Sequence, residues 1–187
     1  MADIFEYLQQ YKSIENEALS ELERRIKTKS FKKDEYILKP GVTCKYLYFV
    51  DAGLVKSFFF KEDKEFIMRF FSENLMFSVF DSYFTQNPSK YALIALEDTT
   101  ITFVSNDVMA GLCLKYHGVE TFFRTLVSIA TVKMMKRIGE MLEDNATERY
   151  KQFVEENNDI LLRISLGDMA KYLGITQQSL SRIRAAK

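Results

Sequence analysis

The spacing of hydrophobic and polar positions changes along the chain and marks off zones of different structure. Over residues 4–29, apolar positions recur at three- and four-residue intervals, which is typical of helices. Over residues 31–105 the chain turns to short segments rich in β-branched and aromatic residues, which predict strands. Turn signals such as Pro40-Gly41 and Asn87-Pro88 separate these segments. Many short strands at regular spacing indicate a barrel or a sandwich. The segments are EYIL, KYLYFV, LVKSFFF, EFIMRFF, YALIAL and TITFV.

Helical spacing returns after residue 105, with a short helix expected over 106–114 and a long one over 119–144. At ~1.5 Å per residue the long helix would measure ~40 Å. An apolar stripe of that extent needs cover on more than one side. We expect the β domain to cover one side and a second copy of the chain another; the alternative is a helix packed only within its own monomer. The stripe consists of Phe122, Leu126, Ala130, Met134, Ile138 and Met141.

The C-terminal residues predict a helix-turn-helix. Before it, residues 145–147 are expected to form a joint, with Thr147 capping a helix over 148–157. Gly174 can take the positive φ that ends a helix, and Thr176 stands where an N-cap hydroxyl belongs. The expected core positions are Met169, Ala170, Leu173, Ile175, Leu180 and Ile183. The outward positions of the second helix are Gln177, Gln178, Ser181, Arg182 and Arg184.

Composition narrows the class of protein. The chain has 187 residues, of which 47% are hydrophobic and 28% charged, and this profile predicts a globular protein with a sizeable core. No apolar run reaches the ~18 residues of a membrane span, and the N-terminus is too polar and acidic for a signal peptide. We therefore expect a cytoplasmic protein that does not contact the membrane. Cys44 and Cys113 are too few for a disulfide framework or a four-thiolate cluster.

Charge is distributed unevenly along the chain. The formal net charge is zero, but from Arg163 onward five basic residues stand against the single acidic Asp168, a local charge of +4. Local charge governs attraction to phosphates, so the whole-chain value is a poor guide. The outward glutamine, serine and arginine side chains of the last helix suit base edges and phosphates better than a core. The sequence therefore predicts a DNA-binding protein.

Four motifs, taken in order, carry a resemblance to a known family. They are Leu38-Lys-Pro-Gly41, Tyr46-Leu-Tyr-Phe-Val-Asp-Ala-Gly-Leu-Val55, Ala95-Leu-Glu-Asp-Thr99 and Gly174-Ile-Thr-Gln-Gln-Ser-Leu-Ser-Arg-Ile-Arg184. The first three resemble strand and turn signatures of a cyclic-nucleotide-binding domain, and the fourth resembles a recognition helix. Together they resemble the Crp-Fnr family of bacterial transcription regulators over essentially the whole chain. Most members continue into a small β wing, whereas this sequence stops at Lys187.

The resemblance implies an α+β fold in three parts. Residues 1–117 would form an antiparallel β roll (a double-stranded β-helix of jelly-roll type) flanked by helices, residues 118–145 the long dimerisation helix, and residues 146–187 the helix-turn-helix domain. A homodimer would place its recognition helices in successive major grooves of a near-palindromic operator, ~34 Å apart. RNA polymerase and a small-molecule effector are further candidate partners.

The same resemblance assigns contacts to DNA. Gln177, Gln178 and Arg182 match base-reading positions, because glutamine can pair with adenine and arginine with guanine. Ser181 would contact a base or a phosphate. Thr176, Lys171 and Arg184 would hold phosphates, which adds affinity without sequence information.

The ligand pocket departs from the family. Members that bind cyclic AMP carry a Gly-Glu pair and, shortly after it, an Arg-Ser pair. Aligning the chain through its Ala-Leu-Glu-Asp-Thr motif places Ser78-Val79 at the first pair and Ser89-Lys90 at the second. The ribose-binding carboxylate and the phosphate-binding guanidinium fork are both missing, and losing one charged contact costs ~1.5–3 kcal/mol. We predict that cyclic AMP does not bind in the family's usual way and that the chain needs no cofactor.

Other effector chemistry has few candidates. Arg69 alternates with apolar neighbours and is a candidate anion contact; the alternative is an outward charge on a sheet. The aromatic residues around the expected pocket would either fill it or bind an apolar effector. They are Phe66, Phe70, Phe77, Phe80, Tyr83 and Phe84. Haem or iron–sulfur sensing would need more ligands than His117 and two distant cysteines.

Two other classes of protein are alternatives to a DNA-binding regulator. A cupin-type enzyme needs several histidine and carboxylate ligands on its strands, but the only histidine, His117, lies outside them. We therefore expect neither a catalytic nor a metal site. A β-roll module that binds a ligand or a protein, and no DNA, is the second alternative, and the outward Gln-Gln-x-x-x-Arg face argues against it.

Overall fold

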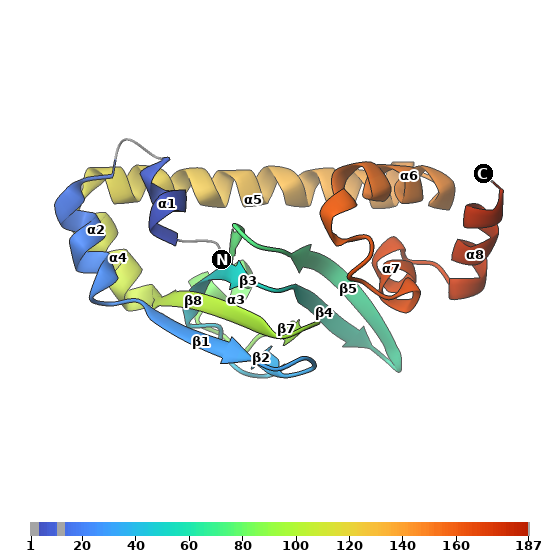
Figure 1. The fold of residues 1–187 in the computed structure, drawn as a ribbon, viewed down its shortest axis with the longest axis horizontal. Coiled ribbons are helices and arrows are strands. Elements are labelled where there is room, and N and C mark those ends of the chain that lie inside the picture. Colours follow the sequence, from blue (N-terminus) through green and yellow to red (C-terminus); the bar gives the residue numbers. More distant parts are fainter. Residues whose placement is uncertain (1–3, 11–13, 187) are drawn as a thin grey trace.

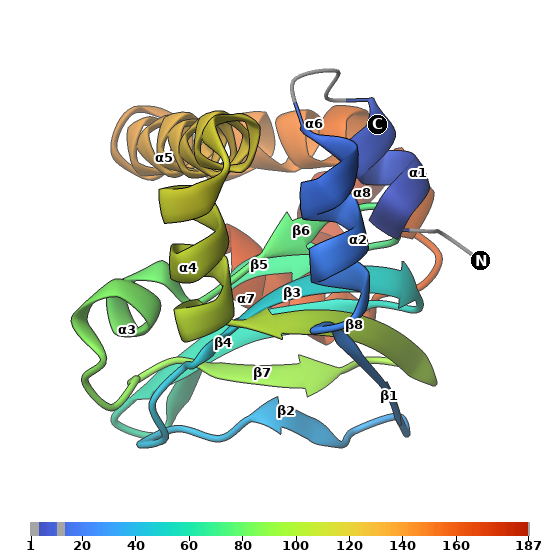
Figure 2. The same ribbon diagram turned by 90° about the vertical axis from the view of Figure 1, so that its left-hand side faces the viewer.

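The computed structural model describes residues 4–10 and 14–186 and shows a β roll covered by one long helix (Figure 1). Two antiparallel sheets of four strands form the roll, in the orders β1-β8-β3-β6 and β2-β7-β4-β5. Figure 2 shows the two sheets below the long helix. The strands are β1 (Lys27–Phe31), β2 (Tyr36–Leu38), β3 (Tyr46–Ala52), β4 (Val55–Lys61), β5 (Lys64–Phe71), β6 (Met76–Phe77), β7 (Ala92–Ala95) and β8 (Thr99–Ser105).

Helices frame the roll at both ends. α1, α2 and α4 lie at one end, α5 runs along the whole molecule, and α7 and α8 lie at the other end beyond the β4–β5 hairpin (Figure 1). The described helices are α1 (Ile4–Gln9), α2 (Asn16–Glu23), α3 (Phe80–Thr85), α4 (Asn106–Lys115), α5 (His117–Glu143), α6 (Ala146–Glu156), the 3-10 helix η1 (Asn158–Ile160), α7 (Leu166–Leu173) and α8 (Gln177–Ala185). None of the helices within the described ranges has the length and apolar composition that a membrane span needs.

Three apolar clusters hold these parts together. One fills the roll between its sheets and includes Phe71, Phe77 and Leu93. A second joins the roll to α2, α4 and the start of α5. The third joins the β4–β5 hairpin to the C-terminal helices, with Phe70 packed against Phe153 and Tyr172 at ring-centroid distances of 6.1 and 5.6 Å. The helix-turn-helix therefore shares a core with the roll.

The expected α+β fold is confirmed, with an antiparallel roll, a long helix and a helical C-terminal end. All six expected strand segments form strands, and the two helices expected over 106–114 and 119–144 are α4 and α5. Two-residue β6, which pairs with β3, was not anticipated. The division at residues 117 and 145 stays a prediction.

The expectation of helix up to residue 29 was wrong. Residues 27–31 form β1, which pairs with β8 along its whole length, from Lys27 opposite Phe103 to Phe31 opposite Thr99. Four of its five residues are exposed, so the strand has no apolar alternation for a sequence pattern to detect. A partner strand about 70 positions away in the sequence decides its conformation. Residues 11–13 of the same zone lie outside the described residues.

The expected cap at Thr147 was also wrong. Asn145 is the N-cap of α6: its side chain accepts hydrogen bonds from the backbone N–H groups of Thr147 and Glu148. The Glu148 carboxylate accepts in return from the Asn145 N–H at 2.8 Å. This reciprocal capping box satisfies more of the orphan amides at the helix start than a lone threonine hydroxyl would.

Candidate functional site

The C-terminal elements form the expected helix-turn-helix. α7 ends at Gly174, whose φ of 69° lies in the left-handed region that glycine tolerates. The Thr176 hydroxyl caps α8 by accepting from the N–H of Ser179 at 3.1 Å. Sequence reasoning missed the cap of α7, where the Ser165 hydroxyl accepts from the N–H of Asp168 at 2.9 Å. The Ser-x-x-Asp spacing is the signal that could have revealed it.

The two faces of α8 differ as the sequence predicts. Leu180 is buried and Ile183 half-buried, and they meet Met169, Ala170 and Leu173 of α7 in a small shared core. The opposite face is solvent-exposed along the length of the helix. The exposed polar residues there are Thr176, Gln177, Gln178, Ser181, Arg182 and Arg184. Six of the seven expected DNA contacts thus lie together on one open surface.

The basic residues on this domain have different surroundings. Arg182 and Arg184 are exposed and form no ion pair within the described residues. Lys171, on α7, is half-buried and its Nζ lies 2.7 Å from Oε2 of Glu65 on β5. Lys171 therefore faces the roll in this structure, and it could reach a phosphate only after that ion pair opened.

Lys171 belongs to an ionic cluster between the roll and α7. Lys56 on β4 lies between two carboxylates, with its Nζ 2.8 Å from Oε1 of Glu65 and 2.8 Å from Oδ1 of Asp168. Glu65 in turn binds Lys171, so two cations and two anions alternate across the interface. The side chains of Lys56, Glu65 and Asp168 are only 12–14% exposed. Their charges are paired where water is largely excluded. Removing one charged side chain would therefore leave its partner buried without a counterion and lower the stability of the fold.

A second ionic contact lies beside the first. The guanidinium of Arg163, just before α7, reaches two turns of the roll: Nη1 and Nη2 lie 2.9 and 2.8 Å from the Glu73 carboxylate, and Nη2 lies 2.6 Å from Glu97. Glu73 also accepts from the N–H of Gly53 at 2.8 Å. This bidentate pairing fixes orientation as well as distance. Sequence reasoning missed both ionic contacts.

The ionic cluster shifts the pKa values of Glu65, Asp168 and Lys56. Burial raises the pKa of Glu65, but hydrogen bonds from Lys171 and Lys56 and their charges outweigh it and lower that pKa below its ordinary value. Burial likewise acts against ionisation of Asp168, and the contacts with Lys56 and Ser165 bring its pKa down overall. Desolvation lowers the pKa of Lys56, and its two carboxylate partners raise it by more. Glu65, Asp168 and Lys56 are therefore charged near neutral pH.

α5 also holds the helix-turn-helix. The guanidinium of Arg137 donates to the backbone carbonyl of Tyr172, and its Cζ lies 3.9 Å from the centroid of the Tyr172 ring. From α6, Arg149 Nε donates to the carbonyl of Leu173 at 3.2 Å. The last carbonyls of a helix have no N–H donor within the helix. These two arginines supply donors for the carbonyls at the end of α7. α7 is thus tied to β4, β5, α5 and α6.

The apolar stripe of α5 divides into two halves. Phe122 and Leu126 are buried in the chain's own core, and Ala130 is half-buried. Met134, Ile138 and Met141 are 43–47% exposed. A neighbouring row is also exposed: Leu142, which widens the predicted stripe, and Ile129, Val132 and Met135, which the sequence analysis did not single out. Their three-residue and seven-residue spacing is the signal that could have revealed it.

The residues aligned with the family's ligand pocket do not converge. Ser89 is buried and bonded within its own turn, donating to the carbonyl of Tyr91 and accepting from its N–H. Lys90 is exposed, 5.0 Å from the Tyr91 ring centroid. Ser78 donates to the carbonyl of Tyr46 at 2.8 Å, and Val79 is buried before α3. Ser78 and Val79 line the cavity between the roll and α5, whereas Ser89 and Lys90 are not among its lining residues.

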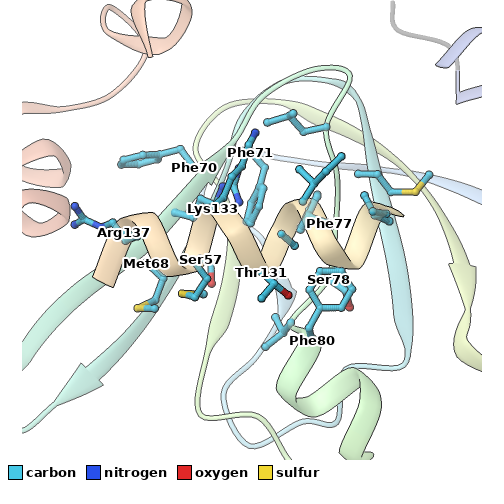
Figure 3. Close-up of a pocket in the computed structure, with 18 of the residues that line it drawn as sticks. Ser57, Met68, Phe70, Phe71, Phe77, Ser78, Phe80, Thr131, Lys133 and Arg137 are labelled. Atoms are coloured by element: carbon cyan, nitrogen blue, oxygen red, sulfur yellow. The ribbon is translucent and has the colours of Figure 1, made fainter. Parts of the chain in front are cut away.

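A large cavity lies between the roll and α5 (Figure 3). Its volume is about 1060 Å³. Phe70, Phe71 and Phe77 line it from the strands and Lys133 from α5, as Figure 3 shows, and Arg69 is among the lining residues. The expected aromatic cluster is only partly found there. Phe66 stacks on Phe59 instead, at a centroid distance of 5.4 Å, and Tyr83 belongs to the cluster with α4 and α5.

The cysteines and the histidine lie apart from these sites. Cys44 is buried beside Ser78, 3.4 Å from its hydroxyl. Cys113 is half-buried on α4, where burial raises the pKa of its thiol. His117 is the first residue of α5. Over residues 4–10 and 14–186, no three His, Cys, Asp or Glu side chains come together as a metal site would require.

Comparison with known proteins supports this architecture. Residues 28–116 match the family model of the cyclic nucleotide-binding domain. FixK2 from Bradyrhizobium japonicum is 22% identical, with 86% of this chain and 83% of that chain covered and a TM-score of 0.75. A structure from Eubacterium rectale, described as a putative transcriptional regulator of the crp/fnr family, is 16% identical. The match covers 97% of this chain and 87% of that chain, with a TM-score of 0.76.

A third structure is that of CLP from Xanthomonas campestris, described as a c-di-GMP responsive global regulator. It is 11% identical over 92% of this chain and 91% of that chain, with a TM-score of 0.72. No curated protein matches the chain.

A β roll that matches the cyclic nucleotide-binding domain model, a long helix and a C-terminal pair of helices joined by a turn define the architecture of this chain. The chain has the Crp-Fnr fold over nearly its whole length, and the resemblance derived from the four motifs is confirmed.

Proposed function

We propose that this protein is a sequence-specific, DNA-binding transcriptional regulator of the Crp-Fnr type, and not an enzyme. One observation carries the proposal. The outer face of α8 presents six exposed polar side chains, of which Arg182 and Arg184 have no acidic partner within the described residues. Exposed arginines without acidic partners are free to bind an external anion, and DNA phosphates and guanine edges are acceptors of that kind.

We assign the contacts by chemistry. Gln177, Gln178 and Arg182 lie toward the N-terminal and middle turns of α8 and read bases, with Ser181 beside them. Arg184 and the N-terminal Thr176 hold phosphates. Lys171 adds a phosphate contact once its ion pair with Glu65 opens.

We further propose that the protein is a homodimer joined through α5. Val132 and Met135 are 68% and 62% exposed on a helix that already buries its other side against the roll. A cluster of exposed apolar side chains on one helix is the usual mark of a protein interface. Two such helices packed together would carry two helix-turn-helix units, as a two-fold operator requires.

In this proposal residues 1–117 sense, residues 118–145 dimerise and residues 146–187 bind DNA in the cytoplasm, with RNA polymerase as a further partner. The described contacts support a coupling route, because β5 and α5 both touch α7 through Lys171 and Tyr172. A change in the packing of the roll against α5 would reach the DNA-binding domain directly.

The proposal is tested by selecting bound DNA from a random duplex library with the purified protein. We expect a two-fold symmetric motif with half-sites about one helical turn apart. The triple variant Gln177→Ala, Gln178→Ala, Arg182→Ala should select none, while a control triple of exposed residues on the roll, Lys33→Ala, Lys39→Ala, Lys61→Ala, should select the same motif. Absence of any enriched motif with the wild-type protein, over a range of salt concentrations, would favour a protein-binding module instead.

The dimer is tested separately by sedimentation equilibrium. Val132→Glu with Met135→Glu should convert a dimer to a monomer, because two charges would be buried at the interface without partners. Leu162→Glu, at a fully exposed position after η1, is the control and should leave the mass unchanged. A wild-type monomer, or a double variant that stays dimeric, would contradict the assignment to α5.

We also maintain that cyclic AMP is not bound in the family's usual way. Ser89 is committed to its own turn and Lys90 faces solvent, so neither supplies a phosphate contact inside the roll. Titration calorimetry with cyclic AMP should give no dissociation constant tighter than about millimolar. A low-micromolar dissociation constant would contradict this prediction.

A further inference from the structure

Gly167 is the second residue of α7, and its backbone conformation does not call for a glycine. Among the described glycines, Gly41, Gly53 and Gly174 have positive φ values, and Gly167 is not one of this group. Inside a helix, glycine is less favourable than alanine because it loses more conformational freedom on folding. Gly167 therefore weakens its own helix, and the reason has to lie in the space that it leaves beside the backbone.

The side chain of Gln177, the first residue of α8, fills that space. A Cβ atom built on Gly167 would lie 2.5 Å from Nε2 of Gln177 and 3.7 Å from its Cδ. The shorter distance is well inside the ~3.5 Å at which heavy atoms pack, so the Gln177 carboxamide occupies the place of the missing side chain. Oγ of Ser165, the N-cap of α7, borders the same space at 3.6 Å from the added Cβ.

The kind of atom that an added Cβ meets decides what a substitution would do. At Gly53 the Cβ would lie 2.6 Å from the backbone Cα of Thr99, so the backbone itself would have to move. At Gly111, on α4, it would meet nothing within 4 Å. At Gly167 the obstructing atom is the free end of a flexible side chain. Replacing Gly167 would therefore displace the Gln177 carboxamide and leave the fold in place.

The position of this carboxamide matters for reading a base. A glutamine pairs with adenine through two hydrogen bonds, which require one orientation of its amide group. A glutamine without support loses the entropy of several rotamers when it binds. The Gln177 carboxamide already lies against the first turn of α7 in the free protein, so less of that entropy is lost on binding. Support of this kind strengthens the contact with the matching base.

We propose that Gly167 is a positioning residue for sequence readout by α8. Because it has no side chain, the carboxamide of Gln177 lies beside the first turn of α7, held in the orientation that pairs with adenine. Gly167 acts through Gln177 and contacts no base itself. The inference rests on the proposed function, since it concerns how α8 discriminates between bases.

The test compares Gly167→Ala with the wild-type protein on duplexes that carry the selected half-site and every single base-pair replacement in it. Gln177→Ala first identifies the base pair that Gln177 reads, as the position where discrimination is lost. There we expect a preference of about tenfold for the wild-type protein and of less than about threefold for Gly167→Ala. Discrimination at the base pairs read by Gln178 and Arg182 should change by less than about twofold. Adding Gly167→Ala to Gln177→Ala should change nothing further, because the new methyl group then has no carboxamide to displace.

Gly111→Ala is the matched control, because it makes the same change at an exposed helical position with open space around the added Cβ. It should leave every base preference unchanged. Thermal unfolding should show Gly167→Ala to be at least as stable as the wild-type protein, since alanine is the better helix former. A marked loss of stability would overturn the inference, because Gly167 would then serve the fold and not the readout.

The remaining outcomes separate this inference from the proposed function. If the wild-type protein selects a motif but Gly167→Ala keeps full discrimination at the base pair of Gln177, the inference fails and the proposed function stands. The same holds if Gly167→Ala loses discrimination equally at all positions, or if Gln177→Ala affects no base pair. A wild-type protein that selects no motif would overturn both.

Discussion

The two faces of the helix-turn-helix satisfy their charges in different ways. On the inner face, Asp168 and Lys171 are paired with Lys56 and Glu65 of the roll at 2.7–2.8 Å. On the outer face, Arg182 has no such partner within the described residues. The contrast indicates that the inner face fixes the domain in place and that the outer face is left for an external anion.

Substitutions on the two faces should therefore affect different properties of the protein. Changes on the inner face should lower stability, and changes on the outer face should lower DNA binding with stability unchanged. The largest expected effect is in the core that separates the two faces. Leu173 is fully buried between α7 and α8, so Leu173→Ala should lower the free energy of unfolding by about 2–5 kcal/mol.

Chemical denaturation measures this loss. Leu162→Ala is the control, since Leu162 is fully exposed and its truncation should change the free energy of unfolding by less than about 0.5 kcal/mol. Equal effects at both positions would show that the two helices do not share the compact core described above.

The next largest effect concerns the ionic cluster. Glu65→Gln removes the anion shared by Lys56 and Lys171 and should lower the free energy of unfolding by about 1–3 kcal/mol at pH 7. Glu35→Gln is the control, because the Lys29–Glu35 pair is 3.4 Å apart with both side chains about half exposed. Its loss should cost less than about 1 kcal/mol.

Acid should act on the same cluster in a defined direction. The pKa values of Glu65 and Asp168 are lower in the folded protein than their ordinary values of 4.5 and 3.8. Their stabilisation is therefore complete above those ordinary values and is lost as pH falls through the lower folded-state values. Denaturation curves between pH 6 and about pH 3 should show a shallower loss for Glu65→Gln than for the wild-type protein. Parallel curves would show that the cluster contributes nothing.

A smaller and purely electrostatic effect is expected on the outer face. Arg184→Ala should weaken binding to specific and non-specific duplexes alike and reduce the slope of log affinity against log salt by about 1. The free energy of unfolding should change by less than about 0.5 kcal/mol, because the side chain is exposed. Fluorescence anisotropy over a salt series measures the slope. An unchanged slope would remove Arg184 from the phosphate contacts.

Local patterns in the sequence predicted most of the fold. The strands from β2 to β5 carry apolar and aromatic runs, and the turn at Gly174 and the cap at Thr176 are local signals with local causes. β1 escaped prediction because its polar residues adopt strand geometry only by pairing with β8, a long-range contact. Helical spacing up to Ile26 extended the apparent helix past its true end at Glu23.

The candidate site was predicted unevenly for the same reason. The outward residues of α8 follow from helical geometry alone, and the structure places them as expected. The Lys56–Asp168 pair joins residues 112 positions apart, and no local pattern carries that contact. Lys171 was expected on the open surface. Its partner Glu65 lies on another element, and no local sequence pattern indicates that the two residues pair. The cavity also depends on how α5 crosses β5, which sequence spacing does not encode.

The central claim, that the outer face of α8 reads DNA, is tested most directly by measuring base discrimination with and without Arg182. Duplexes carrying the selected half-site would be compared with duplexes in which each guanine in turn is replaced by adenine, by anisotropy at one salt concentration. The wild-type protein should lose about 1–3 kcal/mol of binding free energy at one guanine per half-site, and Arg182→Ala should lose that discrimination at that position only. Identical discrimination profiles for the two proteins would contradict the account.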